Sequence, residues 1–236
     1  MQLHSFLPAV VSFTYGQEMS GKESPVVESI LGKSPDLYSQ FLQTSLLPNK
    51  PTLIKLSSSR DWLISRRIDE LGPVNGILSL FHTNCSVPVD VLEGSSKGYD
   101  TSRRMNMSIH EFFNRCEVDK ERGLYLKDWH AFLHKDSNDP NPYENENTSG
   151  DIYDLPDIFA DDWLNWYYRA SSKRDDYKFI YIGGAETYTA LHHDVCCSYS
   201  WSINLYGSKK WSVYSISSWD YPHPLLSPIN FLFVGL

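Results

Sequence analysis

The spacing of apolar positions along the chain predicts both helices and strands. Apolar residues recur every three or four positions in four segments, which is the periodicity of one helix face. Short apolar or alternating runs between these segments predict strands, and we expect the helices to cover one side of a sheet. The predicted helices are residues 36–47, 60–71, 108–116 and 158–168, and the predicted strands are residues 51–56, 87–91, 124–129, 177–184 and a run that ends at 207–211.

Particular residues mark where two of these helices begin or end. Ser108 and, three residues later, Glu111 form the pattern of a capping box, so a helix is expected to begin there. Gly72 and Pro73 are expected to stop the helix of residues 60–71, because glycine and proline are both unfavourable inside helices.

The distribution of polar residues divides the chain into three parts. Residues 1–33 are expected to be a loose N-terminal lead-in, since residues 16–35 are rich in Gly, Ser, Glu and Lys. Residues 34–214 form the predicted domain, interrupted by a polar loop at 134–151. Residues 215–236 form a hydrophobic tail whose run 231–234 is apolar and uncharged, which is typical of aggregation-prone segments when exposed.

Composition and charge narrow the class of protein. The 236 residues suit a domain with a sizeable core, and the net charge of −8 argues against direct nucleic-acid binding. No apolar stretch is long enough to cross a membrane, so no membrane partner is expected. The four cysteines lack the spacing of a metal site, which favours reduced thiols in an intracellular protein. We expect a cytoplasmic location, with the nucleus as a second one.

The stretch from Thr189 to Asp194 carries the first candidate chemistry. In an extended segment His192 and Asp194 share one face while His193 points away. An imidazole and a carboxylate side by side supply two of the three ligands that hold non-haem Fe(II), and the alternative is a polar pair at a strand end. A second His-x-Asp, at residues 134 and 136, lies in the polar loop and is interpreted as chance.

Two lysines carry the second candidate chemistry. Strand alternation places Tyr125 and Lys127 on one face, where they could reach a dicarboxylate, and Asp128 on the other; a solvent-facing edge is the alternative. The same alternation places Lys209 beside Trp211. A lysine inside a barrel needs an anionic partner, because an unpaired buried charge is costly.

Residues 183–194 and 200–211 resemble the core of the jumonji-C (JmjC) oxygenases. The matching sequences are Gly-Gly-Ala-Glu-Thr-Tyr-Thr-Ala-Leu-His-His-Asp and Ser-Trp-Ser-Ile-Asn-Leu-Tyr-Gly-Ser-Lys-Lys-Trp. Residues 46–51, 123–130 and 161–165 agree as well, so the resemblance runs from about Ser34 to about Trp211.

The resemblance implies a fold and a cofactor site. The implied fold is α+β, a double-stranded β-helix (jelly-roll, cupin-like) with flanking helices, which this chain would leave incomplete at its C-terminus. His192 and Asp194 would bind Fe(II). Cofactor residues implied for 2-oxoglutarate are Lys209, Thr189, Tyr125, Asn204 and Ser202, the last at a position where many relatives carry asparagine.

The implied activity is Fe(II)- and 2-oxoglutarate-dependent protein hydroxylation. A lysyl residue of the translation termination release factor is the implied protein substrate, and histone lysine demethylation is an alternative within the family. The family's third ligand is a later histidine, whereas His223 lies close by in a proline-broken segment. We therefore expect a truncated product that does not turn over. A non-catalytic binding module or an unstable splice product is the rival interpretation, and the oligomeric state is left open.

Overall fold

The computed structural model describes a part of the chain in which the sheet and most helices lie. The described residues are 9–14, 28–29, 37–49, 52–55, 57–81, 84–92, 102–117, 119, 123–134, 152–159, 162–171, 177–184, 187–190, 192, 194, 198–207, 209, 211 and 231–235. His223, Cys196, Cys197 and Lys210 lie outside these residues, as does the polar segment 135–151.

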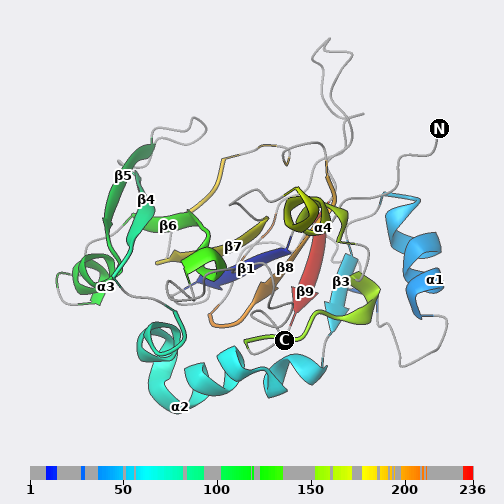
Figure 1. Cartoon of the computed structure of the whole chain (residues 1–236), viewed down its shortest axis with the longest axis horizontal. Helices are drawn as coiled ribbons and strands as arrows, with labels where there is room; N and C mark the ends of the chain where they lie inside the picture. Colours follow the sequence, from blue (N-terminus) through cyan, green and yellow to red (C-terminus); the bar gives the residue numbers. More distant parts are fainter. Residues whose placement is uncertain are drawn as a thin grey trace, which may run out of the picture.

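Within this part of the chain, nine strands form one open, mixed sheet in the order β2-β3-β9-β8-β1-β7-β6-β4-β5 (Figure 1). Neighbours from β2 to β7 pair in parallel, and neighbours from β7 to β5 pair antiparallel. The strands are β1 Ala9–Thr14, β2 Glu28–Ser29, β3 Thr52–Lys55, β4 Ser86–Leu92, β5 Ser102–Ser108, β6 Leu124–Trp129, β7 Lys178–Gly183, β8 Ser200–Asn204 and β9 Phe231–Gly235.

This sheet agrees with the predicted class only in part. Strands and flanking helices are present as expected, but the sheet is open rather than closed. A jelly-roll is built from antiparallel strands, whereas β1 pairs in parallel with both β7 and β8. The double-stranded β-helix is therefore not confirmed by the described strands.

Three strands, β1, β2 and β9, lie in segments that the sequence assigned to the lead-in and the tail. β1 occupies the middle of the sheet, and β9 lies between β3 and β8. The residues of these strands were predicted to be loose or divergent, and the backbones of β1 and β9 are instead paired on both sides. The domain boundaries at residues 33 and 214 stay predictions.

The helices flank the sheet, with α1 and α3 at opposite ends of the molecule and α2 along one side (Figure 1). No helix among the described residues is both long and apolar enough to span a lipid bilayer. The helices are α1 Leu37–Phe41, η1 Leu42–Leu46, η2 Ser57–Asp61, α2 Leu63–Leu78, α3 Ile109–Glu117, η3 Ala131–His134, η4 Asp157–Phe159 and α4 Trp163–Ala170.

Helix α2 shows how the predicted stop signal acts. Gly72 has a φ of 79°, a left-handed conformation that favours glycine, and it kinks the helix where an end was predicted. The chain then resumes helical geometry from Pro73 to Leu78, because proline is well tolerated in a first helical turn. The prediction was right about the break and wrong about the end.

The core joins the helices to the sheet through aromatic contacts. The ring of Trp201 on β8 stacks on Phe159 with centroids 4.7 Å apart, and Phe159 meets Phe41 of α1 edge-on at 6.0 Å. All three side chains are fully buried. In the segment 158–168, Phe159 is therefore part of the core, whereas Trp163 and Trp166 are 45% and 60% exposed.

Candidate metal and carboxylate site

The predicted site residues converge from three parts of the sheet. Tyr125 lies on β6, Thr189 and the His192–Asp194 pair follow β7, and Lys209 follows β8. β6 and β7 are hydrogen-bonded neighbours, so the segments that carry these side chains leave the sheet close together. Residues far apart in sequence are thereby placed around one volume.

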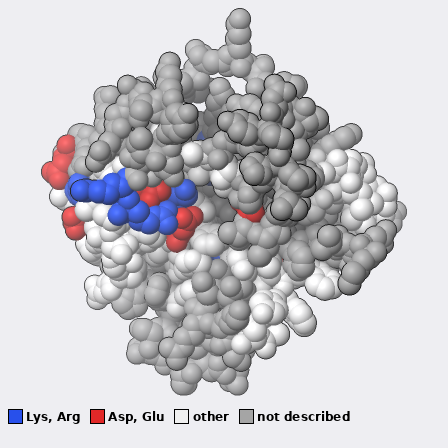
Figure 2. Space-filling model, turned by 90° about the horizontal axis from the view of Figure 1, so that it is seen from above, with Lys and Arg blue, Asp and Glu red and all other residues white. Residues whose placement is uncertain are grey.

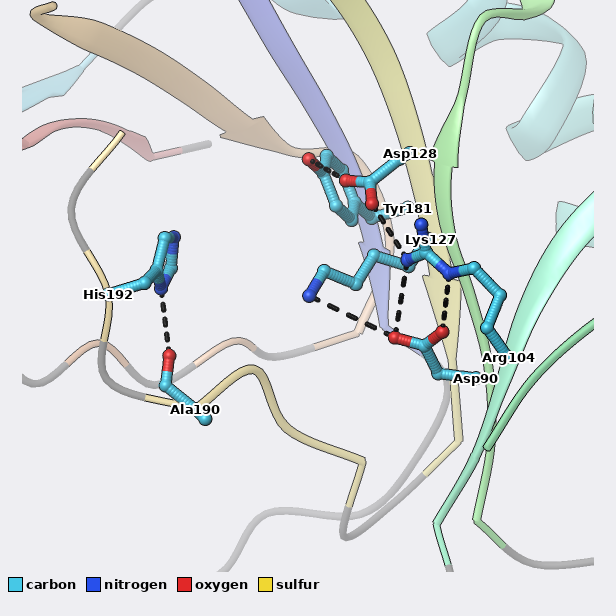
Figure 3. A network of polar contacts seen from close by, with 7 residues as sticks. All are labelled: Asp90, Arg104, Lys127, Asp128, Tyr181, Ala190 and His192. Atoms are coloured by element: carbon cyan, nitrogen blue, oxygen red, sulfur yellow. Dashed lines mark hydrogen bonds and ion pairs between the residues drawn. The ribbon is translucent and has the colours of Figure 1, made fainter. Parts of the chain in front are cut away.

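His192 and Asp194 point toward each other. Nε2 of His192 lies 3.6 Å from Oδ1 of Asp194, and its Nδ1 lies 2.8 Å from the carbonyl oxygen of Ala190. A carbonyl only accepts, so Nδ1 carries the proton in the contact with Ala190 (Figure 3), and Nε2 faces the Asp194 carboxylate. The described residues around the pair do not form a strand, and the two side chains lie on one side, as expected for an extended segment.

This donor pair fits a divalent metal ion. Two atoms bound to one ion at about 2.1 Å lie roughly 3–3.6 Å apart for bond angles of about 90–120°. The hydrogen bond from Nδ1 orients the ring, as partners of metal-binding histidines do. Hydrogen bonding to Asp194 also raises the pKa of His192 when no metal is bound. Among the described residues, no group of three or more His, Cys, Asp or Glu side chains could hold a metal.

Tyr125 provides a buried hydroxyl that interacts with Thr189. Burial raises its pKa to about 12 and a hydrogen bond with Thr189 opposes the shift, so the phenol is neutral at physiological pH. Tyr125 lies opposite Gly183 in the sheet, and a Cβ at Gly183 would come within 2.7 Å of Cδ2 of its ring. Glycine at position 183 therefore allows the tyrosine ring to lie across β7.

Lys209 is half-buried after the end of β8. Burial lowers its pKa to about 8, Asp194 acts in the opposite direction, and Lys127 adds to the lowering. Its Nζ lies 4.1 Å from the centroid of the Trp211 ring, which confirms that these two side chains are neighbours. The site therefore contains a desolvated cation near a neutral phenol.

A β-bulge places a carboxylate that alternation had assigned to the other face. Lys127 and Asp128 of β6 together oppose the single residue Tyr181 of β7. Asp128 has a φ of 61°, and its Oδ1 accepts a hydrogen bond of 2.8 Å from the Tyr181 hydroxyl. The prediction that Asp128 points away from Lys127 and Tyr125 assumed a regular strand and is wrong.

Arg104 extends this contact across the sheet (Figure 3). Its Nη2 donates to Oδ2 of Asp128 at 2.8 Å, and its Nε donates to Oδ1 of Asp90 at 2.7 Å. The Lys127 ammonium lies 3.9 Å from Oδ2 of Asp90. The sequence did not point to Asp90 or Arg104, because their contact depends on the pairing of β4 with the unpredicted strand β5. It did not point to Tyr181 either, because the contact of Tyr181 with Asp128 depends on the bulge in β6.

The two remaining predicted residues lie on β8. Ser202 is buried in the strand. The side-chain amide of Asn204 donates a hydrogen bond of 2.7 Å to the carbonyl oxygen of Gly207, which closes the turn after β8. The structure thus assigns Asn204 a role in a turn, and a cofactor role for either residue stays a prediction.

The described surface around β4 and β5 carries charges of both signs. Figure 2 shows Lys and Arg side chains beside Asp and Glu side chains, rather than a face of one sign. The ion pairs of Arg104 with Asp90 and Asp128, and of Arg115 with Glu111, account for part of this mixture. Such pairs offset one another, so this described face is not uniformly positive.

Comparison with known proteins finds similar chains among oxygenases. The chain is 31% identical over 191 residues to "2-oxoglutarate and iron-dependent oxygenase JMJD4" of Danio rerio, covering 78% of this chain and 42% of that protein. It is 31% identical over 184 residues to the protein of that name in Homo sapiens, covering 75% of this chain and 41% of that protein. It is 33% identical over 205 residues to "Arginine-specific demethylase JMJ20" of Arabidopsis thaliana, covering 78% of this chain and 41% of that protein.

The chain thus spans about two fifths of the length of these curated relatives. No family model matches it. No solved structure matches it either.

Proposed function

Because this chain belongs to the JmjC family, we propose that its site serves Fe(II)- and 2-oxoglutarate-dependent oxygenation of a protein. The observation that carries the proposal is the 3.6 Å approach of His192 Nε2 and Asp194 Oδ1. A histidine nitrogen and a carboxylate oxygen are two ligands of the facial triad that binds non-haem iron. The chain covers about two fifths of these relatives, so the activity is proposed for the protein of which these residues form the site.

His192 and Asp194 are the described residues that would hold the iron. When bound, iron would supply the redox chemistry that couples oxidation of 2-oxoglutarate to oxidation of a substrate C–H bond. The Nδ1 hydrogen bond to Ala190 leaves the Nε2 lone pair of His192 on the side of Asp194, where it would be free to bind the ion. A third ligand has to come from outside the described residues, from another chain or from water.

Lys209, Tyr125 and Thr189 would bind 2-oxoglutarate. The Lys209 ammonium offers a charge-assisted hydrogen bond to a carboxylate, which is stronger in a half-buried position than in water. The neutral phenol of Tyr125 and the hydroxyl of Thr189 can donate beside it. Lys127 brings a second positive charge close enough to influence both His192 and Lys209.

The finer assignments rest on the resemblance. We propose that the substrate is a protein and that the reaction is lysyl hydroxylation, with the translation termination release factor as the candidate. Several relatives are named oxygenases and one is named an arginine-specific demethylase, so lysine demethylation is not favoured. We also propose that the described strands belong to a double-stranded β-helix, since JmjC relatives imply a cupin-like jelly-roll fold.

The metal site is tested by calorimetric titration of Mn(II) into the chain. His192→Ala is expected to abolish binding, because it removes one of two described ligands. His134→Ala, the other His-x-Asp histidine, is the matched control and is expected to bind like the unmodified chain. An equal loss of affinity in the two variants would show that His192 is not the ligand.

A non-catalytic binding module is the second candidate, because the described residues supply only two metal ligands. Release of succinate from 2-oxoglutarate distinguishes the two functions. Succinate that forms only with added Fe(II) and is lost in His192→Ala supports the oxygenase. Binding of 2-oxoglutarate with no succinate above background supports the binding module.

A further inference from the structure

The Lys209 ammonium lies over two aromatic rings of different origin. Its Nζ is 4.1 Å from the centroid of Trp211 and 5.3 Å from the centroid of Tyr181, both within the range of cation–π attraction. Trp211 is two residues from Lys209 and belongs to the same segment. Tyr181 belongs to β7, so it is the ring through which the sheet itself contacts the lysine.

Tyr181 is fixed at the end opposite the lysine contact. Its hydroxyl donates to Asp128 at 2.8 Å, and Figure 3 shows the two side chains meeting end to end. The bulge in β6 makes this contact possible, because Asp128 takes the extra position in the strand with a φ of 61°. Asp tolerates this left-handed conformation better than most residues.

Asp128 is fixed in turn by Arg104. Two nitrogens of the Arg104 guanidinium bind Asp90, at 2.7 and 3.3 Å, and one of them also binds Asp128 at 2.8 Å. The planar guanidinium holds both carboxylates in a defined geometry. The contacts thus run through four adjacent strands, β5, β4, β6 and β7, and end at the Tyr181 ring.

The charges of this network balance. Asp90 and Asp128 carry two negative charges, and Arg104 and Lys127 carry two positive ones. The carboxylates of this network are therefore matched by cations of the same network. The aromatic ring, unlike a carboxylate, attracts an ammonium without occupying its hydrogen-bond donors in an ion pair.

We propose that Tyr181, held by Asp128 and Arg104, is a positioning residue that fixes the Lys209 ammonium for the distal carboxylate of 2-oxoglutarate. The inference deepens the proposed function and rests on it. In this proposal the β6 bulge places Asp128 against Tyr181, and Tyr181 holds Lys209 in place. Neither Asp128 nor Tyr181 binds 2-oxoglutarate directly.

The test compares two substitutions of Tyr181 in the full chain saturated with Mn(II). Tyr181→Leu removes the ring and is expected to weaken 2-oxoglutarate binding about three- to tenfold, the range of a partly buried cation–π contact. Tyr181→Phe keeps the ring and loses only the hydroxyl, so a smaller loss is expected. Tyr167→Leu on α4, where the side chain is 49% exposed, is the matched control and is expected to bind like the unmodified chain.

A second arm tests the link to the bulge. Asp128→Ala removes the acceptor and Tyr181→Phe removes the donor of one hydrogen bond, so the effects of the two substitutions should not add: the double variant is expected to bind 2-oxoglutarate about as well as the weaker-binding single variant. Mn(II) affinity and thermal midpoint are measured for every variant. A loss in Tyr181→Leu that appears equally in Mn(II) affinity would indicate general disruption and overturn the positioning role, as would unchanged 2-oxoglutarate affinity.

A third readout needs no ligand. In spectra of the chain labelled with ¹³C-lysine, ring currents should shift the ε-methylene signal of Lys209, which is identified by its absence in Lys209→Arg. Tyr181→Leu is expected to move this signal and Tyr181→Phe to leave it near its original position. An unmoved signal in Tyr181→Leu overturns the positioning role, whether or not 2-oxoglutarate binds. Failure of 2-oxoglutarate to bind the unmodified chain would instead contradict the proposed function.

Discussion

At the residue scale, Lys209 shows what alternation along a strand can predict. Its place beside Trp211 follows from the pattern Gly-x-Lys-x-Trp, and the structure confirms it. Tyr181 could not be found in this way. Its contact with the lysine depends on the register of β6 against β7 and on a bulge that no local pattern announces.

The lowered pKa of Lys209 predicts a pH dependence of ligand binding. Burial lowers this pKa to about 8, so the ammonium is mostly charged at pH 7 and mostly neutral at pH 9. An anionic ligand favours the charged form, so 2-oxoglutarate affinity should fall about tenfold between pH 7 and 9, with proton uptake on binding at the higher pH. Calorimetry in buffers of different ionisation enthalpy measures both quantities.

The matched variant for this prediction is Lys209→Met, which should bind 2-oxoglutarate weakly and with little dependence on pH. Equal 2-oxoglutarate affinity at pH 7 and 9 would contradict the assignment of Lys209 as the ligand's cation.

The lowered pKa of Lys209 also determines how its contribution to the stability of the fold changes with pH. Between pH 8 and the ordinary lysine value of 10.5, the folded chain binds fewer protons than the unfolded chain, so the contribution of Lys209 to stability rises with pH.

At the element scale, the best-predicted feature is the start of α3. Ser108 and Glu111 predicted it, and the Glu111 N–H donates to the Ser108 hydroxyl oxygen at 3.1 Å. The helix then buries Ile109, Phe112 and Phe113 on one face. A cap and an apolar periodicity are both local signals, which is why the sequence could predict this helix.

Removing this cap should destabilise the fold by a limited amount. Ser108→Ala is expected to lower the free energy of unfolding by about 1 kcal/mol, because one N–H of the first helical turn loses its acceptor. Ser108→Asp should retain the stability, since aspartate is also a good cap and its charge suits a helix N-terminus. Urea denaturation measures the change, with the exposed Ser86→Ala as control. Equal effects at Ser86 and Ser108 would contradict the capping role.

The strands that were missed lack such local signals. In β5 the polar residues outnumber the apolar ones and only Met107 is buried among those whose burial is described, so its sequence has little hydrophobic pattern. β1 and β9 are short runs paired in parallel with partners far away in sequence. Periodicity does not encode such pairings, because parallel neighbours are set by the topology of the whole sheet.

At the scale of the whole molecule, one open sheet brings the site together. β6 and β7 present Tyr125 and Tyr181, and the segments after β7 and β8 carry the His192–Asp194 pair and Lys209. The sequence could predict these residue types from their resemblance to JmjC oxygenases. Their support by Asp90, Arg104 and Asp128 required the structure, since these residues come from three different strands.

The central claim is that this assembly is a 2-oxoglutarate site organised by Lys209. Calorimetric titration of 2-oxoglutarate into the Mn(II)-saturated chain tests it most directly. We predict saturable binding that Lys209→Met weakens by on the order of 1.5–3 kcal/mol, the range of a charge-assisted hydrogen bond. Lys178→Met, which removes a half-buried lysine of β7 that lies over Phe132, should leave binding unchanged. Absence of saturable binding, or an equal loss at Lys178 and Lys209, would contradict the account.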